Sequence, residues 1–398
     1  MTPSDNSSQF PLLHLPGADH LEQDRMEADQ MLATSSRSVE AYITAFEERI
    51  RTYTGSQFAI AFSSSSAGLR LCLQALGTQP GDLIITSSFA DNTAVGILIS
   101  AGVVPVFVDV EPRTGNIDSH LVFAAAQDIM QGGKNAQAWL PPKGASIDAR
   151  LKAILPVDVF GQTADLESLL NTAWKYKIKV IEDARETLGT AYKGRQAGAL
   201  ADFGIFNLYY NQEAPTTPAG ILVTDEAQPA EKIFSLRDHL QSSLSSSSEA
   251  GDIHENTHPD PQTAALGLVY MRHLEERIAL RKQVANWYSH YLSGIPGVEI
   301  PMVANHTTQM GWSVYVIRLA PGCDRELITQ QLAARGIPVK PYHQPLHLQT
   351  DLMERFGYQQ GTFPVAEDLG RRSLALPFSG SMQQGQVEQV CRALEQSI

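Results

Sequence analysis

Cysteines, clusters of basic residues and long apolar segments are all scarce in this chain. Its three cysteines, Cys72, Cys323 and Cys391, are far apart and form no Cys-x-x-Cys pair. They predict neither a disulfide framework nor a zinc or iron–sulfur site, and we expect no metal. The 30 basic residues are outnumbered by 43 acidic ones, so the formal net charge is −13. This charge disfavours a nucleic acid or an anionic membrane as a partner.

The longest apolar run, residues 94–110, is interrupted by two glycines, a serine and a proline. It is shorter than the roughly 20 residues of a membrane-spanning helix, and we interpret it as a helix, a turn and a buried strand. Residues 1–5 lack the basic and apolar regions of a signal peptide. Together with the scarcity of cysteine, these features predict a reduced, cytoplasmic setting.

The residues that are present have the balance of a globular protein. Hydrophobic residues make up 43% of the chain and charged residues 18%, which is enough for a sizeable core. The length of 398 residues predicts two or three domains.

Short apolar segments alternate with helical patterns from residue 58 to residue 224. The predicted strands are Phe58–Phe62, Leu83–Thr86, Val104–Val108, Ala153–Val157, Lys179–Glu182, Phe203–Asn207 and Ile221–Thr224. The predicted helices include Ala67–Leu76, Asn92–Ser100, Leu121–Met130 and Leu166–Tyr176. This alternation predicts an α/β fold with a mostly parallel, seven-stranded sheet that is covered on both faces.

The pattern changes near residue 240. Residues 241–251 are rich in serine, which predicts a loop, and a long helical segment follows over residues 261–292. The rest of the chain has the mixed pattern of a small α+β unit. We therefore predict a large α/β domain, residues 1–240, with an N-terminal arm, and a small C-terminal α+β domain, residues 241–398.

A set of motifs occurs in one order along the whole chain. They are Ala61–Leu69, Gly81–Asp82, Phe107–Val110, Pro156–Gln162, Glu182–Ala184, Tyr192–Arg195, Leu236–His239, Ala264–Gly267 and Pro345–His347. This colinear set resembles the DegT/StrS-type sugar aminotransferases, fold-type-I enzymes that use pyridoxal phosphate (PLP). The resemblance implies the fold-type-I aminotransferase architecture, a homodimer with its sites at the twofold interface, and a role in the biosynthesis of amino- or deoxy-sugars or a related secondary metabolite.

The segment from Phe206 to Gly220 matches the cofactor loop of this family, except at its central group. In the family, a lysine six residues after the phenylalanine holds PLP as a Schiff base, and Gln212 occupies that position here. A lysine amine adds to carbonyls and transfers protons, whereas a glutamine amide neither titrates nor condenses with an aldehyde. Lys193 and Lys340 lie in segments typical of the surface and are not predicted to replace it. Ordinary transamination through a lysine-bound cofactor is therefore excluded.

Three further positions match residues that contact the cofactor ring in the family. Asp183 is retained; its counterpart pairs with the protonated pyridine nitrogen, although an aspartate at a strand end can also cap a turn. Glu186 replaces a glutamine that contacts the ring hydroxyl. Asp91 stands where an aromatic side chain covers the ring, and a carboxylate cannot replace that stacking face.

The contacts to the cofactor phosphate are altered as well. Ser65 and Ser66 lie between a strand and a helix, where free N–H groups suit a phosphate but where a serine can also simply cap the helix. The family's phosphate-binding serine is matched by Asn207. Asn256 matches an asparagine that reaches the phosphate from the neighbouring subunit. The resemblance thus implies PLP that is bound non-covalently at best, and we expect no bound cofactor.

Three functions remain open. The first is a repurposed, cofactor-independent enzyme that acts on a sugar or another polar small molecule. Asp91, Glu186 and Glu213 would act as acids or bases in the old cofactor pocket, and Tyr209 would donate a proton beside Gln212. The second is an aminotransferase or dehydratase relative that binds PLP, or its amine form pyridoxamine phosphate, without a covalent bond. The third is a non-catalytic, aminotransferase-like subunit that binds another enzyme of its pathway.

Overall fold

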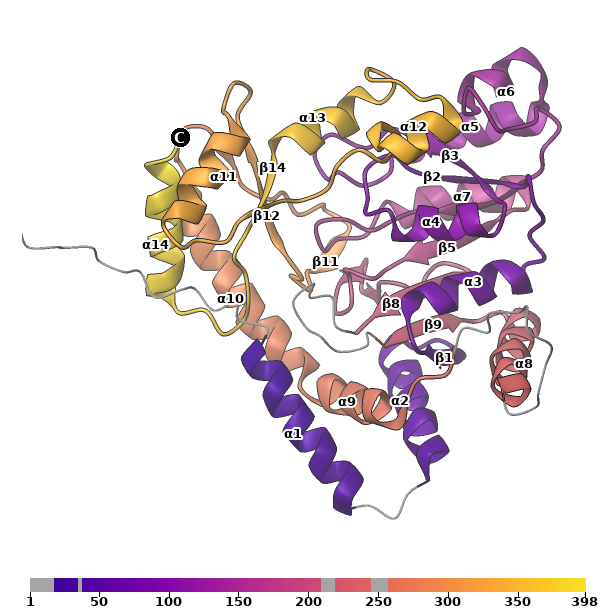
Figure 1. The fold of residues 1–398 in the computed structure, drawn as a ribbon, viewed down its shortest axis with the longest axis horizontal. Coiled ribbons are helices and arrows are strands. Elements are labelled where there is room, and N and C mark those ends of the chain that lie inside the picture. Colours follow the sequence, from indigo (N-terminus) through magenta and orange to yellow (C-terminus); the bar gives the residue numbers. More distant parts are fainter. Residues whose placement is uncertain (1–17, 35–37, 209–218, 245–256) are drawn as a thin grey trace, which may run out of the picture.

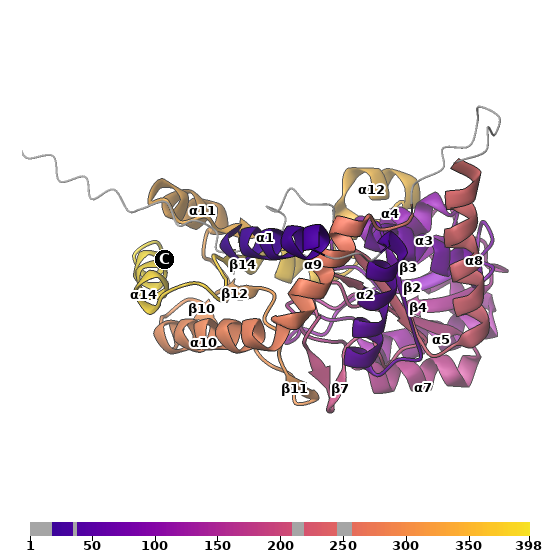
Figure 2. The same cartoon turned by 90° about the horizontal axis from the view of Figure 1, so that it is seen from below.

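The computed structural model of the protein describes residues 18–34, 38–208, 219–244 and 257–398. Two perpendicular views show a large sheet with its helices at one end of the molecule and a smaller sheet at the other (Figures 1 and 2). The C-terminus lies at the end with the smaller sheet (Figure 1).

The large sheet has seven strands in the order β1-β9-β8-β5-β4-β2-β3. They are β1 (Phe58–Phe62), β2 (Leu83–Ser87), β3 (Val104–Val108), β4 (Leu151–Leu155), β5 (Lys179–Asp183), β8 (Phe203–Asn207) and β9 (Gly220–Thr224). Neighbours from β8 through β3 are parallel, whereas β9 is antiparallel to both β8 and β1. The predicted mostly parallel seven-stranded sheet is confirmed.

Helices cover both faces of this sheet, which explains why its strands are mostly apolar rather than alternating. On β1, Ile60 and Phe62 belong to one hydrophobic core, and Ala59 and Ala61 belong to another core on the opposite face. The described helices as far as residue 272 are α1 (Ala18–Thr34), α2 (Val39–Thr54), α3 (Ser65–Ala75), α4 (Thr93–Ser100), α5 (Ser119–Gln131), α6 (Gly133–Trp139), α7 (Leu166–Tyr176), α8 (Ala227–Leu244) and α9 (Pro261–Arg272).

The smaller sheet is antiparallel and has the order β10-β12-β14-β13. Its strands are β10 (Val298–Glu299), β12 (Tyr315–Leu319), β13 (Lys340–Pro341) and β14 (Ser373–Leu376). A third sheet contains β6 (Ala191–Tyr192), β7 (Arg195–Gln196) and β11 (Thr307–Gln309). The remaining helices are α10 (Leu274–Leu292), α11 (Arg325–Ala334), the 3-10 turn η1 (Leu346–Leu348), α12 (Thr350–Phe356), α13 (Pro364–Arg372) and α14 (Gln384–Glu395). The predicted α+β character of the C-terminal part is confirmed.

Two predictions for this half of the chain were wrong in detail. The helical segment 261–292 is two helices, α9 and α10, because the backbone leaves helical geometry at His273, with φ −99° and ψ 5°. The serine-rich loop does not begin at residue 241, because α8 continues to Leu244 and serine is only mildly unfavourable in a helix. Residues 245–251 lie outside the described residues, and the domain boundary at residue 240 stays a prediction.

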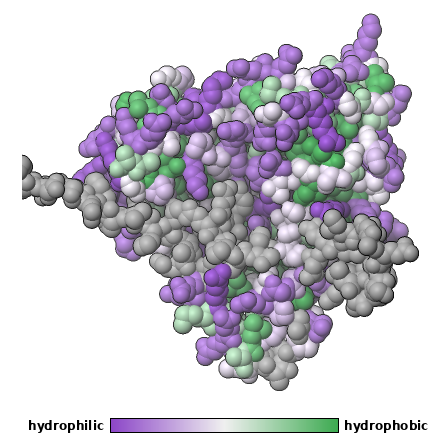
Figure 3. All heavy atoms as spheres, in the orientation of Figure 1, coloured by the Kyte–Doolittle hydropathy of each residue, from purple (hydrophilic) through white to green (hydrophobic). Residues whose placement is uncertain are grey.

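The surface carries mostly hydrophilic side chains with hydrophobic ones scattered among them on the face seen in Figure 3, as is usual for a folded protein in water. None of the described helices is both long and apolar enough to cross a membrane. Within the described ranges, no three His, Cys, Asp or Glu side chains gather in a way that could hold a metal ion.

Candidate functional site

Polar side chains gather where the parallel strands of the large sheet end. Asp183 is the last residue of β5, and Asn207 is the last residue of its neighbour β8. Asp91 follows β2 after a short turn. In open α/β sheets, ligands bind outside the carboxyl ends of the strands, so the candidate functional site lies at this edge.

Arg185 joins the two aspartates of this edge. Its Nε donates to Asp183 Oδ1 at 2.7 Å, and its Nη2 donates to Asp183 Oδ2 at 2.7 Å. The same guanidinium contacts Asp91, with Nη2 at 3.0 Å from Oδ1 and Nη1 at 3.0 Å from Oδ2. The side chains of Arg185 and Asp183 are 9% and 4% exposed. One buried cation therefore binds both carboxylates through paired hydrogen bonds, the strongest arrangement available to these groups.

Burial and charge pairing act on these three groups in opposite directions. Burial would lower the pKa of Arg185, but Asp183 and Asp91 raise it well above its ordinary value. Burial would raise the pKa of Asp91, but Arg185 outweighs this effect and lowers it. At Asp183, burial prevails over Arg185, and the pKa is raised. Asp91 is thus held as a carboxylate of low basicity, and its acid–base role stays a prediction.

The described side chains do not fit the pyridine ring that the resemblance implies. Both carboxylate oxygens of Asp183 already accept hydrogen bonds from Arg185. A protonated ring nitrogen would have to displace this buried guanidinium, which would then lose its strongest partner. Asp91 also faces Arg185 and offers no aromatic surface. We therefore derive no reaction step through PLP in this protein.

Glu186 takes part in a second cluster of side chains. The Tyr342 hydroxyl donates to Glu186 Oε2 and accepts from the Phe160 N–H at 3.0 Å. His343 Nε2 lies 3.7 Å from Glu186 Oε1, and its proximity to Asp91 helps to lower the pKa of that carboxyl. Glu186 and His343 are both buried. A carboxylate, a phenol and an imidazole in such proximity can hold and transfer protons.

The serine turn begins helix α3. Ser64 is the N-cap, and its hydroxyl accepts from the Ala67 N–H at 3.1 Å. Ser65 and Ser66 therefore form the first turn of the helix, where N–H groups have no partner within the helix. Gly220 packs directly on this turn, since a Cβ there would lie 2.2 Å from the Ser65 nitrogen. The roles of Ser65 and Ser66 as phosphate contacts stay predictions.

Two buried oxygen atoms near the turn have no hydrogen-bond partner in the described part of the chain. They are Asn207 Oδ1 and Thr257 Oγ1. Asn207 pairs with Gly220 across β8 and β9, and the Thr257 carbonyl accepts from the Ser63 N–H at 2.9 Å. Both residues thus adjoin the start of α3, where the helix dipole favours an anion. An anionic group could bind here even though the ring site does not fit.

Four predicted site residues lie outside the described residues: Tyr209, Gln212, Glu213 and Asn256. Their roles stay predictions. The sequence interpretation missed three residues that the structure brings into the site: Arg185, Tyr342 and His343. The sequence held a hint of all three. Arg185 is a charged residue between the predicted site residues Asp183 and Glu186, and residues 342–343 lie just before the motif at 345–347.

Asp158 and Glu182 form a buried carboxyl pair beside the site. Burial and the charge of Glu182 raise the pKa of Asp158 well above its ordinary value, and burial raises the pKa of Glu182 to about 7. Asp158 also accepts hydrogen bonds from the Thr187 hydroxyl and the Ala164 N–H, both at 3.0 Å. The pair therefore holds a proton under conditions in which exposed carboxyls are ionised.

The substitution Glu182→Gln should flatten the pH dependence of stability. A carboxyl with a raised pKa stabilises the fold fully below its unfolded-state pKa and loses this effect as pH rises through the folded-state value. The contribution of Glu182 to the stability of the wild type should therefore fall by about 3 kcal/mol as pH rises from below 4.5 to above 7, the ordinary and shifted pKa values of Glu182. Urea unfolding across this range measures the difference. Glu48→Gln, at an exposed ion pair with Arg51, is the control, and equal profiles for all three proteins would contradict the prediction.

Comparisons with known proteins agree with this architecture. The model of the DegT/DnrJ/EryC1/StrS aminotransferase family matches residues 19–395, and the chain belongs to this family. It is 28% identical over 389 residues to the spore coat polysaccharide biosynthesis protein SpsC of Bacillus subtilis, covering 94% of each chain. It is 28% identical over 396 residues to GDP-perosamine synthase of Caulobacter vibrioides, covering 96% of this chain and 97% of the relative. The crystal structure of S. venezuelae DesV in complex with a ketimine intermediate matches with a TM-score of 0.79 at 25% identity and covers 98% of both chains. The family and fold that the sequence implied are confirmed.

Proposed function

We propose that this member of the sugar aminotransferase family is a cofactor-independent enzyme that transfers protons on a sugar or another polar metabolite. The main support is Arg185, which binds both oxygens of Asp183 and also reaches Asp91. In relatives that use PLP, the resemblance assigns the carboxylate at this position to the cationic ring nitrogen. Here the chain supplies its own cation to that carboxylate. With Gln212 at the lysine position, the pocket has neither a covalent anchor nor a free partner for the ring.

The proposed substrate class comes from the relatives. GDP-perosamine synthase and the UDP-2-acetamido-2-deoxy-3-oxo-D-glucuronate aminotransferase of Pseudomonas aeruginosa, which is 27% identical over 359 residues, both carry a nucleotide-linked sugar in their names. We propose a nucleotide-linked keto sugar for this chain as well. A cytoplasmic homodimer, with Asn256 reaching the neighbouring subunit, is part of the same proposal.

Glu186 is the side chain best placed to act as the base. Tyr342 holds its Oε2, while its Oε1 faces His343 at 3.7 Å. A keto sugar carries acidic hydrogen on the carbon beside its carbonyl. Transfer of that proton to Glu186 leaves the electron pair in an enolate, whose oxygen an N–H of His343 can stabilise by a hydrogen bond. Return of the proton from Glu186 to the same carbon restores the ketone and completes an exchange of the hydrogen beside the carbonyl.

Two alternatives are each supported by a specific observation. The first turn of α3 and the nearby Thr257 hydroxyl, which can donate and has no partner among the described residues, favour a phosphate and hence a non-covalently bound PLP or pyridoxamine phosphate. That function would require Arg185 to leave Asp183. The third function, a non-catalytic partner subunit, is supported by the fact that Asp183, Arg185 and Asp91 satisfy one another without any ligand.

Titration of the purified protein with PLP separates the first two functions. We expect no saturable change in the near-ultraviolet and violet absorbance of PLP, and no adduct that survives borohydride, because the ring partner is occupied and no lysine stands at position 212. Saturable binding without borohydride trapping would instead support the non-covalent cofactor. Trapping would show that another lysine holds it.

Proton exchange separates the enzyme from the non-catalytic subunit. The cofactor-free protein is incubated in deuterated water with UDP- and GDP-linked keto sugars, and deuterium next to the carbonyl is followed by NMR. We expect incorporation that falls at least about 100-fold in Glu186→Gln, the usual scale for removing a general base. Glu167→Gln, at an exposed ion pair with Lys193, should behave as the wild type. Lack of exchange, with a stoichiometric partner on purification, would overturn the proposal in favour of the third function.

A further inference from the structure

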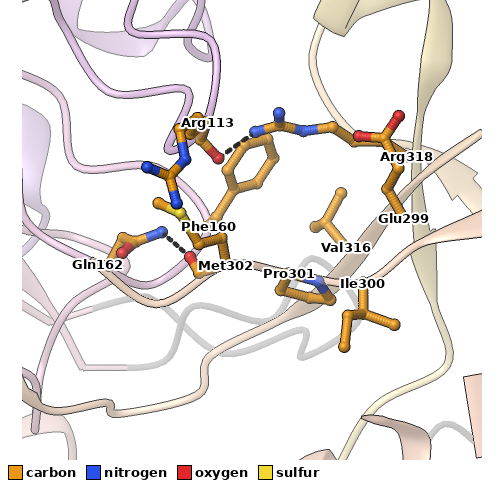
Figure 4. Close-up of a pocket in the computed structure, with 9 residues that line it drawn as sticks. All are labelled: Arg113, Phe160, Gln162, Glu299, Ile300, Pro301, Met302, Val316 and Arg318. Carbon is orange, nitrogen blue, oxygen red and sulfur yellow. Dashed lines mark hydrogen bonds between the residues drawn. The ribbon is translucent and has the colours of Figure 1, made fainter. Parts of the chain in front are cut away.

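A cavity lies between the large and small sheets, and none of the side chains named in the candidate site lines it. It has a volume of about 220 Å³ and is smaller than most pockets for drug-sized ligands. One wall comes from loops that follow β3 and β4 and includes Arg113 and Phe160. The other comes from β10, β12 and the segment after β10, and includes Met302, Val316 and Arg318 (Figure 4).

The cavity carries excess positive charge in a chain whose formal net charge is −13. Arg318 donates to the carbonyls of Pro112 and Arg113 and lies 5.8 Å from the centre of the Phe160 ring. One carboxylate, Glu299, also lines the cavity, and it pairs with Arg372 at 3.2 Å. In the described part of the chain, no carboxylate lies within ion-pair distance of Arg318 or Arg113. Burial lowers the pKa of Arg318, although the charges of Glu299, Glu111 and Asp368 act in the opposite direction.

Apolar side chains complete the lining. Phe160, Met302 and Val316, with Ile300 and Pro301, form the surface beside the two guanidinium groups. A ligand that fits both features has an anionic head and a small apolar body, because the head would compensate the arginines and the body would cover the apolar wall. A strongly hydrated or cationic molecule would satisfy neither.

We propose that this interdomain cavity binds a small organic anion, with a carboxylate or phosphate head between Arg113 and Arg318 and an apolar body against Phe160. The site does not depend on the reaction proposed above, because its occupancy is measured by binding alone.

Phe160 links this cavity to the candidate site. Its ring centre lies 4.8 Å from that of Tyr342, and its N–H donates to the Tyr342 hydroxyl, which in turn holds Glu186. Phe160 has a positive φ of 59°, and a Cβ at Gly115 would lie 2.4 Å from its ring, so the surrounding chain fixes its position tightly. An anion seated against this ring therefore contacts the residue whose N–H binds the Tyr342 hydroxyl.

Calorimetric titration of the full chain with benzoate, phenyl phosphate and neutral benzyl alcohol tests the site. We expect saturable binding of at least one of the two anions, and the stronger of them identifies the head group. Benzyl alcohol should bind at least tenfold more weakly. Arg113→Gln and Arg318→Gln should each weaken anion binding at least tenfold, whereas Arg392→Gln, on the exposed face of α14, should not change it.

Arg113 is the more decisive position, because its side chain is exposed and its replacement leaves the backbone carbonyl that Arg318 contacts in place. Failure of both anions to bind would overturn the proposal. Binding that is unchanged in Arg113→Gln, or equal for benzyl alcohol and the anions, would overturn it as well.

Discussion

Replacement of Arg185 with alanine is expected to lower the free energy of unfolding by about 3–5 kcal/mol near pH 7, the usual cost of removing one partner from a buried ion pair. The substitution leaves the buried carboxylate of Asp183 and the partly buried carboxylate of Asp91 without the guanidinium that binds both. Urea unfolding followed by circular dichroism and fluorescence gives the difference, provided that the dependence on urea concentration keeps the same slope.

The matched control is Arg51→Ala, which removes an exposed arginine from its ion pair with Glu48 and should cost less than about 1 kcal/mol. The loss in Arg185→Ala should also depend on pH. Without the guanidinium, burial would raise the pKa of both aspartates, so the variant should be least stable above neutral pH and recover part of its stability as they become protonated. A loss below about 1 kcal/mol at pH 7 would contradict the buried pairing described above.

Replacement of Gly220 with alanine should destabilise the protein by at least about 3 kcal/mol, at the upper end of the usual cost of overpacking. A Cβ at this position would lie 2.2 Å from the Ser64 carbonyl carbon and the Ser65 nitrogen. These are backbone atoms at the start of α3 and cannot rotate away as a side chain could. Gly220 is also paired with Phe62 and Asn207 on its two neighbouring strands, so β9 cannot shift without disturbing both.

Gly96→Ala is the control for this prediction. Gly96 lies in α4, and a Cβ there would meet no atom within 4 Å. Alanine should therefore stabilise that helix by up to about 1 kcal/mol. Thermal and urea unfolding of both variants measure the contrast. Equal stability of the two variants would show that the contact between Gly220 and the serine turn is looser than described.

The sheet could be predicted from the sequence because its signal is local. Strands such as β2 and β3 are short, fully buried and mostly apolar segments, as expected in a sheet that is covered on both faces. The colinear motifs then assigned these strands to the fold-type-I aminotransferase architecture through the family resemblance. Helix ends were less predictable, as α8 and the break at His273 show, because serine and histidine neither favour nor prevent helix strongly.

The contacts of the candidate site could not be predicted in the same way. Arg185 is two residues from Asp183 but 94 residues from Asp91, and no local pattern indicates that one guanidinium reaches both. Tyr342 and His343 come from the C-terminal part of the chain and meet Glu186 through tertiary packing. The sequence identified the altered positions Asp91 and Glu186, but which group neutralises or holds each of them depends on the fold.

The contacts of Arg185 also bear on what a lysine at position 212 could achieve in this protein. A Gln212→Lys change by itself would offer an anchor to a cofactor whose ring partner, Asp183, is already bound. Loss of Arg185 by itself would remove a large share of a typical stability of about 5–15 kcal/mol, unless a bound ligand offset the loss. Neither substitution is favourable alone, so a lysine-bound ring would require changes at both positions 212 and 185.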